Sequence, residues 1–236
     1  MRYSRQQLKH DAFKETAAEA AHWTGEHRSS LTSFGTLIVV VAVVVGGLWW
    51  YQDWRNEKSS AELGAALNTY TAPLVPPGTP KEGEIPVFYT ARERALAAKN
   101  LLYAISSKYG SAHAAQYAHY LAAMCEVDLE NYKVAEEQLR DISRSHDRDV
   151  SSLAKLALAG LLHDQKRDTD AIALYKELID KPTSTVPKIT AQLGLASLYA
   201  ATNAAAARAI YDQMIKDDPK GPGGQVAQSR KAELKQ

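Results

Sequence analysis

Histidines are the first residues to test for metal chemistry, because neutral imidazole is the commonest metal ligand in proteins. The chain has seven of them among 236 residues, and three fall within the first 30. His113 and His119 are six positions apart, which separates them by about 240° around a helix. The H-E-x-x-H pattern, which puts two histidines on one helix face, is absent. The sequence therefore predicts no metal site.

Two possible nucleophiles also receive a non-catalytic interpretation. Ser152 and Lys155 form the S-x-x-K string of penicillin-binding enzymes, but the S-D-N-like and K-T-G-like motifs that accompany it are missing. The single cysteine, Cys125, is followed by Glu126 and lacks the basic neighbour that activates a thiol. We expect a buried, inert thiol there and predict no catalytic residue. The alternative is an enzyme whose site is assembled from residues that no sequence motif links. Such a site would show a pocket with coupled titratable groups.

Cofactors and nucleic acids are also not expected. Glycine-rich phosphate-binding loops are absent, and Gly221, Gly223 and Gly224 follow no strand and are interpreted as a frayed linker. The 28 basic and 27 acidic residues leave a net charge of +1, whereas nucleic-acid binders carry a strong basic footprint. We therefore predict no cofactor, no nucleic acid and no small-molecule substrate.

A long apolar segment lies near the N-terminus. No charged residue occurs between Arg28 and Asp53, and the run reads FGTLIVVVAVVVGGLWWY. A helix of about 20 apolar residues crosses a bilayer, so we predict a transmembrane anchor over residues 31–52. A buried β-strand over residues 38–45 is the alternative, but core strands rarely lead into several aromatic residues. Aromatic side chains favour the membrane–water interface, and the candidates for that position are Trp49, Trp50, Tyr51 and Trp54.

The anchor is predicted to remain in the mature protein, because its end lacks the small residues of a signal-peptidase site. Its flanking charges are balanced, with Lys14 and Arg28 before it and Arg55 and Lys58 after it. The five basic residues of the whole N-terminal segment tilt the prediction towards a cytoplasmic N-terminus. The following domain would then lie on the other side of the membrane, outside the cytoplasm.

Helical repeats are predicted beyond the anchor. Ala135, Ala171 and Ala207 recur at intervals of 36 residues, and Ala98 precedes Ala135 by 37. A period of this length is typical of repeats built from two helices and a turn. The same apolar register follows each alanine, in the pairs Leu102 and Ile105, Leu139 and Ile142, Tyr175 and Leu178, and Tyr211 and Met214.

The first helices of these pairs complete the pattern. Each carries a small residue that allows close helix packing, such as Ala159 or Ala196, and Pro182 and Pro219 close two repeats. The spacing and these residues resemble the tetratricopeptide repeat. The resemblance implies an all-α fold, in which a single transmembrane helix is followed by a superhelix of helical hairpins. We expect five segments: a cytoplasmic tail (1–30), the anchor (31–52), a helix with a Pro/Gly-rich loop forming a degenerate first repeat (53–89), the repeats (90–220) and a flexible tail (221–236).

Stacked hairpins form a concave surface that binds peptides or protein segments. Some residues predicted to line it are expected to be ordinary packing residues instead. Lys and Asn, which clamp a C-terminal carboxylate in some tetratricopeptide domains, are absent from the corresponding positions, so that ligand is disfavoured. The candidates for protein binding are Tyr117, Tyr120, Met124, Leu156, Gly160, His163, Leu193 and Ser197.

The whole architecture, together with a YG-S-x-x-A string at Tyr109, Gly110 and Ser111, is similar to that of the tetratricopeptide-repeat-like ancillary subunit of the bacterial Sec translocon. The resemblance implies a non-enzymatic protein of the cell envelope whose partners are translocon subunits and periplasmic chaperones. The alternative is a membrane-anchored scaffold or regulatory subunit with its repeats in the cytosol. The two differ in topology.

Overall fold

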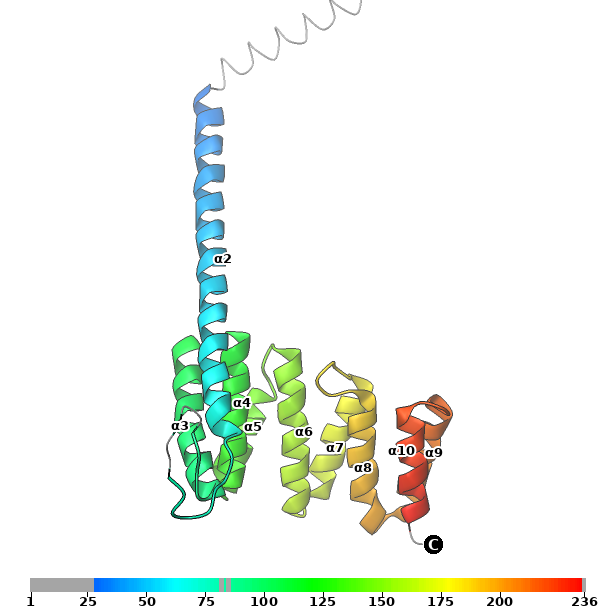
Figure 1. The fold of residues 1–236 in the computed structure, drawn as a ribbon. Helices are drawn as coiled ribbons and strands as arrows, with labels where there is room; N and C mark the ends of the chain where they lie inside the picture. The colour runs from blue at the N-terminus through cyan, green and yellow to red at the C-terminus, as the bar shows by residue number, and fades with distance from the viewer. Residues whose placement is uncertain (1–27, 81–82, 84–85, 235–236) are drawn as a thin grey trace, which may run out of the picture. The chain divides into compact units, whose positions relative to one another are not determined.

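The computed structural model describes residues 28–80, 83 and 86–234. Helices dominate this part of the chain, which confirms the all-α prediction (Figure 1). The chain divides into two units, Met1–Trp54 and Arg55–Gln236, and each is described by itself. The helices are α2 (Arg28–Tyr70), α3 (Ala91–Tyr109), α4 (His113–Asp128), α5 (Tyr132–Ile142), α6 (Arg148–Asp164), α7 (Asp168–Asp180), α8 (Lys188–Thr202), α9 (Ala204–Asp217) and α10 (Pro222–Glu233).

The N-terminal unit contains the apolar part of α2. Its large side chains are exposed on all sides of the helix, with Trp49 and Trp50 at 72% and 68%. A helix that is apolar all round, without a protein core to cover it, matches the interior of a bilayer. Over Thr36–Tyr70 the helix is long and apolar enough to span a membrane. The predicted tail lies almost wholly outside the described residues, which begin at Arg28.

The larger unit is a row of antiparallel helix pairs. Each helix from α3 to α10 contacts the next one along the chain, and α6 also contacts both α4 and α8. The repeated alanines lie at the centre of this packing: Ala98, Ala135, Ala171 and Ala207 are all fully buried. The apolar residues in register with them are buried too. The sequence period therefore marks the same packing position in every second helix of the row, namely α3, α5, α7 and α9.

The ends of the helices follow from local chemistry. Pro182 and Pro219 come two residues after α7 and α9, as the repeat pattern predicts. Gly110 ends α3 with a φ of 55°, a left-handed conformation that favours glycine. Asp147 is the N-cap of α6. Its carboxylate accepts hydrogen bonds from the backbone N–H groups of Asp149 and Val150, both at 3.1 Å.

The start of the larger unit is the C-terminal part of α2. Leu63 and Ala66 of this segment are buried in one cluster with Ala98 and Leu102 of α3. The predicted loop separates the two helices, and its ends are joined where the backbone N–H of Val75 donates to the carbonyl oxygen of Phe88 (2.8 Å). The loop thus connects two helices whose buried residues share one apolar cluster.

The C-terminal segment differs from the flexible tail expected over residues 221–236, because Pro222–Glu233 forms helix α10. Ala227 is fully buried against α9. The glycines interpreted as a frayed linker permit this packing: a side chain at Gly224 would overlap the carbonyl oxygen of Asp218. The backbone N–H of Gly223 also donates to the Asp218 carboxylate (3.0 Å). Close backbone approach, which composition does not reveal, explains these glycines.

Candidate protein-binding surface

Two tyrosines of α4 form the aromatic part of the predicted surface. The rings of Tyr117 and Tyr120 are stacked, with centroids 5.9 Å apart and planes inclined by 30°. Both side chains are half-buried and pack against the apolar clusters of two neighbouring helix pairs. Burial raises the pKa of Tyr120 above its usual range, as does the nearby Tyr117. Such fixed, partly exposed rings provide contact area at low entropic cost.

The aliphatic candidates belong more to the interior. Leu156 of α6 packs against a cluster that includes Leu178 of α7 and Ala191 of α8. Leu193 of α8 packs against the cluster shared by α8, α9 and α10. Met124 of α4 is half-buried. The structure thus gives Leu156 and Leu193 the packing role that was anticipated for some of these residues.

The polar and small candidates are open. Ser197 of α8 is exposed, and a Cβ added to Gly160 of α6 would meet no atom within 4 Å. His163, at the end of α6, lies with Nδ1 2.7 Å from the carboxylate of Asp168, which begins α7. His163 therefore joins two helices of one pair as well as facing solvent. Gly160 and Ser197 are thus accessible in the structure, and their contact with a partner stays a prediction.

A groove of about 530 Å³ brings two of the candidates together. Leu193 and Ser197 line it on α8, and residues of α10 form its other wall. Sequence reasoning missed this wall because it expected a flexible tail. The available signal was the seven-residue spacing of Ala227 and Leu234, which places both on one helix face. The lining residues from α10 and its C-terminal end are Val226, Arg230, Glu233 and Leu234.

The residues considered for chemistry are engaged in structural contacts. Cys125 is fully buried, and burial with nearby carboxylates raises the pKa of its thiol to about 12. The Ser152 hydroxyl donates to the carbonyl oxygen of Arg148 (2.8 Å), while the Lys155 ammonium binds Glu177 (2.7 Å). No cluster of three or more potential metal ligands occurs in the described ranges. The absence of metal and cofactor stays a prediction.

The aromatic residues at the end of the apolar segment belong to the N-terminal unit. The ring centroids of Tyr51 and Trp54 are 6.2 Å apart, and the ring planes are inclined by 30°. Both are largely exposed, as are Trp49 and Trp50. Their position at a membrane–water interface stays a prediction.

Comparison with known proteins gives one match. A family model described as a tetratricopeptide repeat-like domain matches residues 30–228. Searches of curated proteins and of solved structures returned no match. The matched range covers the apolar segment, helices α3 to α9 and the first part of α10.

Proposed function

We propose a membrane-tethered protein-interaction module, because this chain belongs to the tetratricopeptide repeat-like domain family. Such domains are typically non-catalytic and bind other proteins. The observation that supports the proposal is the contact of α6 with both α4 and α8, and we expect the solvent-facing residues of these helices to form one surface. Tyr117 and Tyr120 would anchor a bound polypeptide, and the open positions at Gly160 and Ser197 would leave room for it.

The tether follows from the apolar part of α2. Its exposed valine, leucine and tryptophan side chains form a far larger apolar surface than a soluble monomer usually presents. Insertion into a bilayer would cover that surface. Tethering also raises the local concentration of the repeats near partners in the same membrane, so a modest affinity is sufficient.

The more specific part of the proposal concerns the cell envelope. The resemblance to the ancillary subunit of the bacterial Sec translocon supports an inner-membrane protein with a cytoplasmic N-terminus and periplasmic repeats. Its role would be accessory to protein translocation or periplasmic chaperoning, with translocon subunits and chaperones as partners. A cytosolic scaffold is the alternative, because the charges that flank the anchor are balanced and do not fix its orientation.

Site-specific crosslinking in living cells tests this function. A photoreactive benzoylphenylalanine is placed at Ser197, and in a matched strain at Ala173, an exposed position on α7 outside the predicted surface. We expect adducts with translocon subunits or periplasmic chaperones from Ser197 and far fewer from Ala173. Equal adducts from both positions, or none from Ser197, would refute the surface. Adducts with cytosolic proteins would favour the scaffold.

A further inference from the structure

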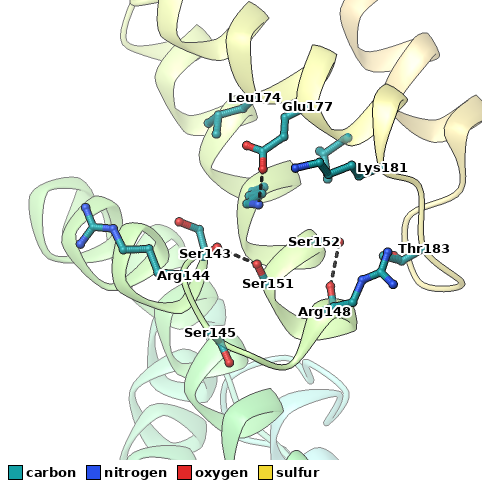
Figure 2. Close-up of a pocket in the computed structure, with 12 residues that line it drawn as sticks. Ser143, Arg144, Ser145, Arg148, Ser151, Ser152, Leu174, Glu177, Lys181 and Thr183 are labelled. Carbon is teal, nitrogen blue, oxygen red and sulfur yellow. Dashed lines mark hydrogen bonds and ion pairs between the residues drawn. The ribbon is translucent and has the colours of Figure 1, made fainter.

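A second hollow, of about 550 Å³, opens between the α5–α6 connection, α6 and α7 (Figure 2). None of the eight residues predicted for the concave surface lines it. Its walls carry four basic side chains and one carboxylate, with Leu174 and Leu178 as an apolar strip. The basic residues are Arg144, Arg148, Lys155 and Lys181, and the carboxylate is Glu177.

The positive charge of this cationic cleft (the hollow lined by Arg148, Lys155 and Lys181) is largely uncompensated. The ammonium of Lys155 is paired with Glu177 at 2.7 Å. Within the described part of the chain, Arg148 and Lys181 form no ion pair. Lys181 extends over the hollow, whereas Arg144 points away from its centre (Figure 2). Two free cations at the mouth favour a ligand that carries negative charge.

Hydroxyl groups give the cleft a second property. The Ser151 hydroxyl donates to the carbonyl oxygen of Ser143 (2.6 Å), and the Ser152 hydroxyl donates to that of Arg148 (2.8 Å). Since each hydroxyl has one hydrogen, both serines can only accept further hydrogen bonds. A phosphate dianion, which also only accepts, is poorly matched to them. Peptide N–H groups are well matched.

We propose that the cationic cleft binds an acidic polypeptide segment. Glutamate or aspartate side chains of the segment pair with Arg148 and Lys181, and its backbone N–H groups donate to Ser151 and Ser152. The methylene groups of its side chains lie against Leu174. Glu177 disfavours dense polyanions and anionic lipid surfaces. The inference rests on the proposed function in that the ligand is a polypeptide, but it assigns a separate surface.

Fluorescence anisotropy tests the proposal with the full chain in neutral detergent. The probes are labelled decapeptides of alternating Glu and Ala, or of Gln and Ala. We expect the Glu peptide to bind at least about tenfold more tightly than the Gln peptide. The double variant Arg148→Glu/Lys181→Glu should weaken binding of the Glu peptide by at least about tenfold, because like charges then face each other.

The matched control is Lys133→Glu/Lys176→Glu, which makes the same charge change at exposed positions of α5 and α7 outside the cleft. The affinity of this control variant for the Glu peptide should stay within about twofold of that of the unsubstituted protein, a difference of about 0.4 kcal/mol. Equal weakening by both double variants, or equal binding of both peptides, would overturn the proposal. Circular dichroism establishes that both variants keep their helices.

Competitors separate the other ligand classes. Displacement of the Glu peptide by sodium phosphate, beyond that by sodium chloride of equal ionic strength, would overturn the proposal in favour of a small-anion site. Displacement by phosphatidylglycerol micelles but not phosphatidylcholine micelles would overturn it in favour of a lipid site. The crosslinking experiment at Ser197 tests the concave surface separately. If Ser197 gave no adducts while the Glu peptide still bound the cleft, the concave surface would be refuted and the proposal for the cleft would be supported.

Discussion

Replacement by alanine should change the stability of the larger unit in opposite directions at two helical glycines, Gly194 and Gly160. Gly194 of α8 lies beneath the ring of Tyr175 of α7, and a Cβ added there would overlap the ring edge and lie 2.9 Å from Cζ. Tyr175 is only 8% exposed, so its ring has little room to move. A Cβ added to Gly160 of α6 meets open space. The two substitutions therefore gain the same helix propensity but differ in the packing that the added methyl group meets.

The magnitudes follow from these contacts. Replacing glycine by alanine inside a helix gains about 1 kcal/mol, so Gly160→Ala should stabilise the unit by about that amount. Overpacking a core costs about 1–3 kcal/mol, so Gly194→Ala should destabilise it by up to about 2 kcal/mol. For a unit of this size, each kcal/mol shifts Tm by about 2–4 °C.

Thermal unfolding of the full chain in detergent, followed by circular dichroism at 222 nm, measures both variants. Tm should rise for Gly160→Ala and fall for Gly194→Ala. In a Tyr175→Leu background, which removes the ring, Gly194→Ala should become stabilising. Equal increases in Tm for both single variants would refute the packing of α7 on α8 described above.

Three further predictions concern the core, the thiol and a helix cap. Leu139→Ala, at a fully buried position, should lower the free energy of unfolding measured in urea by about 2–5 kcal/mol. The control Leu101→Ala, at a 46% exposed position, should lower it much less. Equal losses would contradict the assigned core. Native Cys125, whose thiol pKa is raised to about 12, should resist maleimide at pH 8 until the chain is denatured; rapid native labelling would contradict its burial. Partial burial raises the pKa of Asp147, but hydrogen bonds from His113 and backbone N–H groups outweigh it and lower the pKa below 3.8, so its contribution to stability is present above pH about 4 and lost as the pH falls through the folded pKa. Asp147→Asn can still cap α6, but it should lower the free energy of unfolding at pH 7. The variant should also lose less stability than the unsubstituted protein as the pH falls below 4, measured by urea unfolding across that range. An unchanged dependence of stability on acid pH would contradict the charge effect.

The repeats were predictable because their packing is periodic. Ala135, Ala171 and Ala207 occupy one structural position, and only a small residue fits where two helices cross. The sequence shows this as a fixed interval. The role of the predicted surface residues in binding stays a prediction.

The C-terminal helix was not predictable in the same way. Its glycines, Gly223 and Gly224, are typical of linkers in composition, and their role depends on close contact with Asp218, which is visible only in three dimensions. The cationic cleft was not predictable from the sequence for the same reason. Arg148 and Lys181 are 33 positions apart, and the α6–α7 pairing brings them to one hollow.

The central claim, that a membrane anchor holds a protein-binding array outside the cytosol, is tested most directly by topology. Alkaline phosphatase and, separately, green fluorescent protein are fused after Gln236 in a bacterial host. The account predicts phosphatase activity without fluorescence, because phosphatase folds only outside the cytosol and the fluorescent protein only inside it. Fluorescence without phosphatase activity would place the repeats in the cytosol and contradict the account.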